Sequence, residues 1–484
     1  MIIICKIMLL RRLCVLTLTL FVLATVSPVV RGDDPPDILF IAIDDLNDWV
    51  GVLGGHPQAR TPRIDGLAER GMLFTNAHAS APLCNPSRTA LLTGLLPSSS
   101  GVYENEADWR QLEVFRNIST LPRFFRDQGY ETIGAGKIFH AHTFDTEGFS
   151  GYNDPNAWSR FFPSVDRQLP DEVVPPDRPV NGNPFTKDLD WHALTETADR
   201  MGDTQVAAWI SDQLASTTGR PRFVAAGIYR PHLPWYTPSE HFDSYPLEAI
   251  ELPDTLAGDL DDVPEVATMP YLEITDRPPM ALHRWIVSED KWREGVQAYL
   301  ASVSYADAQA GRILDALDAS GRSDETIIVL FSDHGFHLGE KQRWRKYTLW
   351  EESTRVPLII VAPGVTAPGS RSSRPVSLMD IYPTLAELAG LPIPGHVEGN
   401  SLLPLLRDPA TAWDSAAITT SGFRNHSVRS ERYRYTRYSD RSEELYDLEA
   451  DPHEWNNLID EAGSASVRDA LAEWLPKRDN PPHR

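Results

Sequence analysis

Largely apolar runs recur along the chain, and polar residues follow several of them. The runs span residues 37–43, 131–135, 223–228, 326–331 and 357–362. Uninterrupted runs of this length are typical of strands buried inside a parallel sheet. Segments with helical spacing of apolar residues lie between them, at 64–70, 121–128, 290–317 and 378–388. This alternation predicts an α/β fold with a central, mainly parallel sheet flanked by helices.

The pattern changes near residue 408. Short strands are predicted at 417–420, 427–438 and 445–448, and a last helix at 464–474. We therefore expect a large domain over residues 33–407 and a small α+β subdomain over 408–484. Two further stretches, 143–183 and 238–279, lack this periodicity and are rich in Pro, Asp and aromatic residues. They predict ordered insertions that cover the functional edge of the sheet, because Gly/Ser-rich linker sequence is missing.

Residues 1–32 have the layout of a secretory signal peptide, with basic residues around the apolar run 13–26. This run is shorter than the roughly 20 residues that cross a bilayer. We therefore expect export to the periplasm or the medium, without stable membrane insertion. Cleavage would remove Cys5 and Cys14 and leave Cys84 alone. A single cysteine cannot pair within its own chain, so a large core must supply the stability.

The chain is strongly acidic, with a formal net charge of −23. Such a surface repels nucleic acids and anionic membranes, so we expect neither as a partner. An anionic substrate would need a local basic pocket. The run 341–346 concentrates four cations in this acidic sequence. It is either a solvated charged loop or a surface that faces an anionic ligand.

Two acidic clusters directly follow apolar runs. Asp44 and Asp45 follow the first run, and Asp333 and His334 follow the fourth. The carboxyl ends of parallel strands share the edge where open α/β sheets place their ligands. Three carboxylates at one place need a cation, and oxygen-rich ligation favours Ca²⁺ or Mg²⁺ over zinc. Asp44 and Asp45 alone would more commonly be a helix N-cap pair, and either cluster alone is a weak signal.

Cys84 stands two residues before Pro86, which suits the first turn of a helix through residues 87–93. The free N–H groups and the dipole of a helix start favour a thiolate, an aldehyde hydrate or a bound anion. Arg88 lies one turn further on. A lone cysteine is more often inert packing, but the Cys-x-Pro-x-Arg string favours a functional role.

Lys137, His140 and His232 lie in loops that follow predicted strands. Gly134 and Gly136 let the backbone approach a ligand closely. In isolation, each of the three would be interpreted as an ordinary loop residue.

The string Cys84-Asn85-Pro86-Ser87-Arg88, with Leu92-Thr93-Gly94, resembles the motif of the type I sulfatases. The likeness covers nearly the whole mature chain, through the segments 61–68, 136–137, 332–335 and 445–448. The iduronate-2-sulfatase branch is the most similar one, in the segments 137–140, 229–234, 299–305 and 346–347. The resemblance implies an alkaline-phosphatase-like sandwich with a smaller C-terminal subdomain.

In that family a maturation enzyme converts the motif cysteine to formylglycine, whose hydrate attacks the sulfur of a sulfate ester. The resemblance implies one Ca²⁺ per chain, with these ligands: Asp44, Asp45, Asp333, His334 and the modified Cys84. It also implies three cations that hold the sulfuryl group: Arg88, Lys137 and Lys346. His232 would protonate the leaving alcohol, and His140 would take the proton that lets sulfate depart.

Two departures bear on the substrate, which we expect to be a sulfated saccharide. Phe336 stands where human-type iduronate enzymes carry Trp, and the run 341–345 is more basic than expected of that branch. We therefore hypothesise a polymer with several anionic groups, one of them bound by Arg343 or Arg345. The alternatives are a phosphate or phosphonate ester hydrolase of the same superfamily and a non-catalytic glycan-binding protein. The intact Cys84 motif argues against the second.

Overall fold

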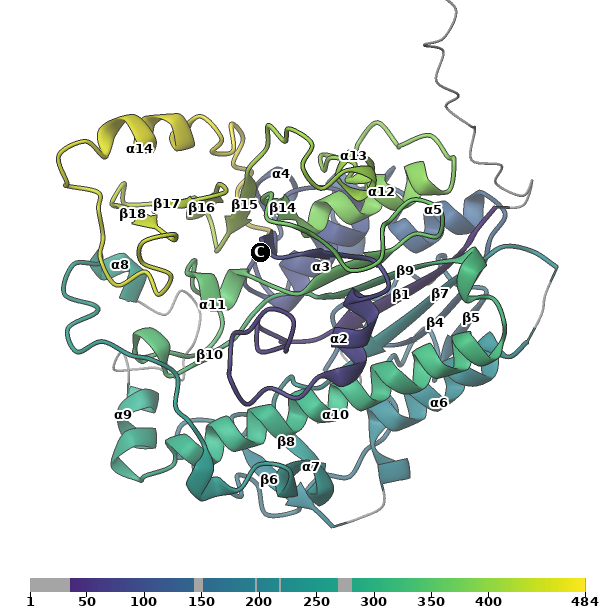
Figure 1. Cartoon of the computed structure of the whole chain (residues 1–484), viewed down its shortest axis with the longest axis horizontal. Helices are drawn as coiled ribbons and strands as arrows, with labels where there is room; N and C mark the ends of the chain where they lie inside the picture. Colours follow the sequence, from purple (N-terminus) through teal and green to yellow (C-terminus); the bar gives the residue numbers. More distant parts are fainter. Residues whose placement is uncertain (1–34, 143–150, 196–197, 217–218, 269–280, 484) are drawn as a thin grey trace, which may run out of the picture. The chain divides into compact units, whose positions relative to one another are not determined.

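The central sheet has eight strands, in the order β13-β2-β12-β9-β1-β7-β4-β5 (Figure 1). Its middle consists of four parallel neighbours: β9 (Thr326–Ser332), β1 (Asp37–Ile43), β7 (Arg222–Ile228) and β4 (Glu131–Gly136). All four correspond to predicted apolar runs, and they are buried along nearly their whole length. Ile43 pairs with both Ile228 and Ser332, so three adjacent strands end at the same level.

The outer strands make the sheet mixed. β12 (Leu358–Val361) runs antiparallel to both β9 and β2 (Met72–Phe74), and β13 (Ser370–Ser372) is parallel to β2. At the other edge, β5 (Arg160–Phe162) is parallel to β4. The sequence pattern did not predict β2, β5 and β13, because three residues carry too little periodicity. β5 belongs to the stretch 143–183, so part of this insertion extends the sheet.

Two hydrophobic cores cover the two faces of the sheet. Leu39 and Ile41 of β1 pack with residues of α10 (Trp292–Ala319), α6 (Gly202–Leu214) and α2 (Pro62–Ala68). The alternate residues Ile38 and Phe40 pack with α3 (Cys84–Thr93), α5 (Leu121–Asp127) and α12 (Ile381–Leu388). Figure 1 shows these two groups of helices on opposite sides of the strands. The predicted α/β sandwich is confirmed.

Shorter elements connect these layers. The two-residue strands pair as β3 (Ala77–His78) with β14 (Val376–Ser377) and β10 (His337–Leu338) with β11 (Trp344–Arg345). β6 (Trp191–Leu194) pairs with β8 (Trp235–Pro238). The short helices are α4 (Pro97–Ser100), α7 (Ser239–Asp243), α8 (Glu265–Thr268), α9 (Ala281–Ser288), α11 (Glu351–Thr354) and α13 (Leu403–Arg407).

A second, antiparallel sheet follows near the C-terminus. It consists of β15 (Ala417–Thr420), β16 (His426–Arg429), β17 (Tyr433–Arg437) and β18 (Glu443–Asp447), and α14 (Ala465–Ala472) follows it. The single strand predicted over 427–438 is therefore two strands joined by a turn. These elements form the expected α+β C-terminal subdomain, whereas its boundary at 407/408 stays a prediction.

This computed structural model describes residues 35–142, 151–195, 198–216, 219–268 and 281–483. The predicted signal peptide and parts of both predicted insertions lie outside these ranges. Contacts unite the residues from Pro36 onward into one unit. Among the described residues, no helix combines the length and apolar character needed to cross a membrane.

Candidate active site

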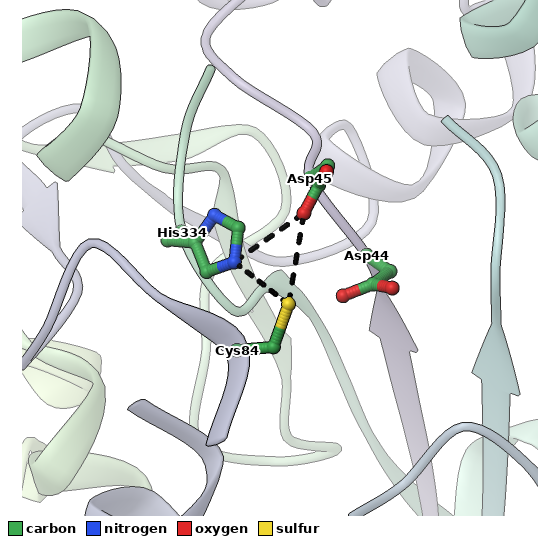
Figure 2. Close-up of side chains that lie close together, drawn as sticks. All are labelled: Asp44, Asp45, Cys84 and His334. Atoms are coloured by element: carbon green, nitrogen blue, oxygen red, sulfur yellow. Dashed lines mark hydrogen bonds and ion pairs between the residues drawn. The ribbon is translucent and has the colours of Figure 1, made fainter. Parts of the chain in front are cut away.

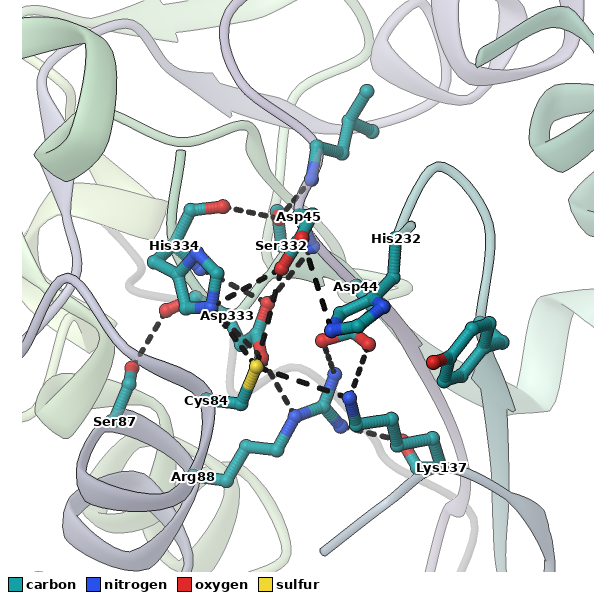
Figure 3. Close-up of polar contacts among 12 residues, drawn as sticks. Asp44, Asp45, Cys84, Ser87, Arg88, Lys137, His232, Ser332, Asp333 and His334 are labelled. Atoms are coloured by element: carbon teal, nitrogen blue, oxygen red, sulfur yellow. Dashed lines mark hydrogen bonds and ion pairs between the residues drawn. The ribbon is translucent and has the colours of Figure 1, made fainter. Parts of the chain in front are cut away.

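The ends of the four parallel strands bring the predicted site residues together (Figure 3). Asp44 and Asp45 follow β1, and Asp333 and His334 follow β9. Lys137 follows β4, and His232 lies in the loop after β7. Each side chain is placed by a strand whose position in the sheet is fixed by hydrogen bonds on both sides. The shared carboxyl edge is therefore the reason why residues far apart in sequence meet.

Cys84 is the first residue of α3, which confirms its predicted place at a helix start. Leu83 before it is extended, with φ −158° and ψ 139°, and its side chain cannot cap the helix. Asn85 is held by the loop that follows α4, because its N–H donates to Asn105 Oδ1 at 3.0 Å. All residues of α3 are buried, so the sulfur of Cys84 is held in a fixed place.

Arg88 lies one helical turn after Cys84 and connects three strand ends. Its Nη2 lies 3.0 Å from Asp44 Oδ1, and its Nε lies 2.7 Å from Asp333 Oδ2. Its Nη1 donates to the carbonyl oxygens of Lys137 and Ile138. The guanidinium thus donates its hydrogen bonds to protein groups, and its direct effect is to hold the carboxylates of Asp44 and Asp333 in place.

Two ammonium groups converge on the sulfur of Cys84. Lys346 Nζ lies 3.0 Å from Sγ and 2.6 Å from Asp45 Oδ1. Lys137 Nζ lies 3.8 Å from Sγ and 2.5 Å from Asp44 Oδ2. Burial raises the pKa of the Cys84 thiol, but the charges of Lys137 and Lys346 outweigh it, so the net pKa is lowered. The position therefore favours an anion.

Four of the side chains can share a metal ion (Figure 2). Among the described residues, one ligand atom each of Asp44, Asp45, Cys84 and His334 lie within 4.8 Å of one another. Oδ2 of Asp45 is buried and has no hydrogen-bond partner in the described part of the chain. Asp333 lies beside this group, with Oδ1 accepting the N–H of Asp45 at 3.2 Å and Oδ2 bound to Arg88.

The electrostatics of this group favour a positive charge. Burial lowers the pKa of His334, but Asp333 and other anions outweigh it and raise the pKa to about 9. Burial raises the pKa of Asp45 to about 6 against the opposing effect of Lys346. For Asp44, the charges of Lys137 and Arg88 outweigh burial and hold the pKa well below its usual value.

His232 and His140 are both buried and differ in what their rings contact. Nδ1 of His232 lies 2.7 Å from the carbonyl oxygen of Leu233, so this nitrogen carries the proton, and Nε2 faces Asp45 Oδ2 at 3.9 Å. Nδ1 of His140 has no partner among the described residues. Burial, followed by the charge of Lys137, lowers the pKa of both rings well below the usual value. Burial thus favours the neutral form of both imidazoles.

Tyr229 contacts two of these residues and was not predicted. Lys137 Nζ lies 4.9 Å from the centre of its ring, and the His232 ring lies 4.6 Å away. An ammonium over an aromatic face is held by the ring quadrupole. Its place directly after β7, three residues before His232, was the available signal, but an aromatic residue there is usually interpreted as packing.

The basic run 341–346 does not form a free cationic surface. Lys341 is only 2% exposed and lies 2.8 Å from Asp259 Oδ1. Arg343 is 6% exposed and donates to the carbonyl oxygen of Thr268. Arg345 donates to Thr186 Oγ1 at 3.1 Å. Of the four cations, Lys346 is the one that reaches Cys84, and the polyanion hypothesis for Arg343 loses its support.

Comparison with known proteins agrees with this geometry. The sulfatase family profile matches residues 36–391, and that of the N-sulphoglucosamine sulphohydrolase C-terminal region matches residues 339–480. A sulfatase of Formosa agariphila is 38% identical over 458 residues, which cover 92% of this chain and 87% of the relative. Human iduronate 2-sulfatase is 34% identical over 400 residues, 75% of this chain and 70% of the relative.

Solved structures show the same fold. One, a protein in complex with its substrate D-glucosamine-2-N,6-O-disulfate, has a TM-score of 0.70 and 22% identity over 91% of this chain and 97% of its own. The phosphonate monoester hydrolase of Agrobacterium radiobacter has a TM-score of 0.67 and 24% identity over 91% and 94%. The fold is thus alkaline-phosphatase-like. On the family match and the sequence relatives, the chain belongs to the sulfatase family, whose members hydrolyse sulfate esters.

Proposed function

We propose that this sulfatase removes sulfate from a sulfated saccharide, using a nucleophile made from Cys84 and a Ca²⁺ ion at the strand ends. The observation that carries the proposal is the convergence of Lys137 and Lys346 on the sulfur of Cys84. A sulfate ester bound there would place its anionic oxygens beside two ammonium groups, next to the residue that attacks its sulfur. Preorganised cations of this kind stabilise the charge of a transition state more than that of a solvated substrate.

The proposed ligands fit a hard divalent cation: Asp44, Asp45, Asp333, His334 and residue 84. Carboxylate oxygens dominate the set, the free Oδ2 of Asp45 is buried among them, and the surroundings raise the pKa of His334 to about 9. These features support the binding of a cation at this place. When bound there, Ca²⁺ would supply Lewis acidity toward sulfate oxygens and the nucleophile.

The family chemistry requires Cys84 to become formylglycine, with an aldehyde hydrate as the attacking group. A maturation enzyme must act before the site closes, because Cys84 is fully buried in the folded chain. The predicted signal peptide would send the product to the periplasm or the medium. The test is the mass of the peptide that contains residue 84, from protein made in its native host: conversion lowers it by about 18 Da. Active preparations with unmodified cysteine throughout would contradict the proposal.

The chain's own groups divide the remaining work. Arg88 holds Asp44 and Asp333 in place, and Lys137 and Lys346 bind the sulfuryl oxygens. His232 presents Nε2 to the site, and a bound sulfate anion beside it would raise its pKa and load it with the proton for the leaving alcohol. For His140, burial favours the neutral form, and its buried Nδ1 has no partner among the described residues, which suits a proton acceptor.

The substrate class is proposed from the relatives. Human iduronate 2-sulfatase shares 34% identity, and a protein of the same fold was solved with a disulfated glucosamine. A panel of defined sulfated saccharides, assayed for released sulfate, would identify the sugar and the position. Activity confined to small aryl sulfates would contradict a saccharide substrate.

Phosphate or phosphonate ester hydrolysis is the second candidate, because a phosphonate monoester hydrolase shares the fold. Paired aryl sulfate and aryl phosphonate esters with the same leaving group separate the two functions. We expect kcat/KM to be higher for the sulfate ester. A non-catalytic glycan-binding role would be supported by sulfated-saccharide binding without turnover of either ester by protein whose residue 84 is formylglycine.

A further inference from the structure

The segment that carries Lys346 has an unusual backbone. Four of its non-glycine residues have positive φ: Lys341 (49°), Gln342 (54°), Arg345 (79°) and Tyr347 (80°). Side chains with a Cβ rarely adopt this region, because the Cβ crowds the following carbonyl oxygen. Two of these residues flank Lys346 directly. Such a conformation persists only where surrounding contacts hold it.

The C-terminal sheet provides one of these contacts. Ser421 follows β15, is 5% exposed, and donates its hydroxyl to the carbonyl oxygen of Tyr347 at 2.8 Å. The N–H of Tyr347 donates in turn to the carbonyl oxygen of Pro82, at 3.1 Å. Both backbone polar groups of the residue after Lys346 are therefore used, one by the C-terminal sheet and one by the chain leading to Cys84.

The same end of β15 also holds the segment that precedes Cys84. Thr420 N–H donates to the carbonyl oxygen of Ser80 at 2.9 Å, and Thr419 Oγ1 donates to that of Ala79 at 2.6 Å. Three consecutive residues, 419–421, thus bind both the approach to the nucleophile and the residue beside Lys346. The distance from Lys346 Nζ to Cys84 Sγ is set across this junction.

The far end of the basic segment is anchored separately. Lys341 Nζ lies 2.8 Å from Asp259 Oδ1 and donates to the carbonyl oxygen of Glu454. It lies 5.3 Å from the ring centre of Trp350 and 5.5 Å from that of Tyr446. The first cation of the run is therefore an internal anchor, and the last one enters the site.

We propose that Ser421 is a positioning residue for Lys346, through which the C-terminal sheet takes part in catalysis. The inference rests on the proposed role of Lys346 in binding the sulfuryl group. The lysine stem is flexible, so its ammonium stays beside residue 84 only if the backbone on which it starts is fixed. Ser421→Ala removes the bond to the Tyr347 carbonyl oxygen, so the backbone at φ 80° is held less firmly beside Pro82.

The test compares Ser421→Ala with Ser421→Thr, which keeps the hydroxyl, in full-length enzyme with formylglycine at position 84. The control is Ser430→Ala, in a turn of the same sheet, which removes a 3.0 Å bond to the carbonyl oxygen of Tyr433 and the 2.9 Å bond that the Tyr433 N–H donates to Ser430 Oγ. We expect Ser421→Ala to lower kcat/KM about fivefold and to raise the inhibition constant of inorganic sulfate by a similar factor. Ser421→Thr should stay within about twofold of wild type, and Ser430→Ala should match wild type.

A double-mutant cycle with Lys346→Met shows whether Ser421 acts through Lys346. If it does, Ser421→Ala has no further effect on kcat/KM once the ammonium is gone. Equal effects in both backgrounds, or equal kinetics of Ser421→Ala and Ser430→Ala, would overturn the inference while the proposed function stands. Full activity of Lys346→Met would instead overturn the proposed role of Lys346, and this inference with it.

Discussion

Among the buried groups of cations and carboxylates in the described part of the chain, two invite comparison, because one surrounds a reactive atom and the other does not. At the strand ends, Lys137 and Lys346 pair with Asp44 and Asp45. Beside the C-terminal sheet, the fully buried Arg434 lies 2.6 Å from Glu454 Oε1 and also pairs with Glu351, and Lys341 pairs with Asp259 nearby. The charged side chains of both clusters are largely buried. A search for buried titratable groups alone would rank both as functional sites.

The two clusters differ in the groups toward which their cations point. In the first cluster both ammonium groups also point at the sulfur of Cys84, at 3.0 and 3.8 Å. In the second, Arg434 donates to the carbonyl oxygen of Leu349 and to Thr354 Oγ1, and Lys341 lies against the rings of Trp350 and Tyr446. The cations of the second cluster therefore stabilise the fold, whereas those of the first cluster point to the place where a ligand would bind.

The largest expected effect is at the reactive atom itself. Cys84→Ala removes the precursor of the nucleophile, so we expect kcat/KM to fall by about 10⁴-fold or more. The first helical position accepts Ala, so the midpoint of thermal unfolding should change little. The measurements are sulfate release and the unfolding midpoint on the same preparation. If Cys84→Ala still released sulfate, residue 84 would not be the nucleophile, and the cations that point at it would not serve catalysis.

Metal removal should act on the first cluster alone. Without a divalent cation, the carboxylates of Asp44, Asp45 and Asp333 are balanced only by basic side chains, so we expect exhaustive chelation to lower activity by about 100-fold. The unfolding midpoint should fall with it, because an ion that binds only the folded state stabilises that state. Added Ca²⁺ should restore both. Metal analysis that finds no ion in fully active protein would contradict this assignment.

The two lysines of the basic run allow a matched comparison. In enzyme loaded with Ca²⁺, which would balance the charge of Asp45, Lys346→Met should lower kcat/KM by about 100-fold with a small change in stability, because the lysine charge serves the bound sulfate. Lys341→Met leaves Asp259 buried without its cation, so we expect it to lower the free energy of unfolding by about 3 kcal/mol. Chemical denaturation and steady-state kinetics of both variants test this. If Lys341→Met lowered activity and Lys346→Met lowered stability instead, the catalytic role would belong to the second cluster and the structural role to the first.

The sequence predicts the first cluster well because its residues follow strands or open a helix. Asp44 and Asp333 come after apolar runs, so the local pattern places them at one sheet edge. The pattern places Cys84 at a helix start, and the resemblance to the type I sulfatases brings it into the same site. It does not separate Lys341 from Lys346, which lie in one charged run. Lys341 is buried against Asp259 and Glu454, which lie far away in the chain, whereas Lys346 enters the site. This difference also depends on positive φ angles, which no periodicity in the sequence reveals.

Glu444 of β18 is a buried carboxyl that interacts electrostatically with Lys341 and Glu454 of the second cluster, and it should make the stability depend on pH. Burial is the main cause that raises the pKa of Glu444 from its usual 4.5 to about 7, and this carboxyl accepts from Trp350 Nε1 at 3.0 Å. Because the folded pKa is the higher one, folding favours the protonated form. The stability that this adds is fully present below about pH 4.5 and is lost as pH rises to 7.

Glu444→Gln keeps an acceptor for Trp350 and removes the titration. Its free energy of unfolding, relative to wild type, should therefore rise by about 2 kcal/mol between pH 5 and pH 8. Glu449→Gln, at an exposed carboxylate of the same subdomain, controls for the change in net charge. Denaturation at both pH values measures the difference, and parallel pH profiles for Glu444→Gln and wild type would contradict it. Because Glu444 lies outside the first cluster, the shape of the kcat/KM profile should be the same in both proteins, which separates a structural charge from a catalytic one.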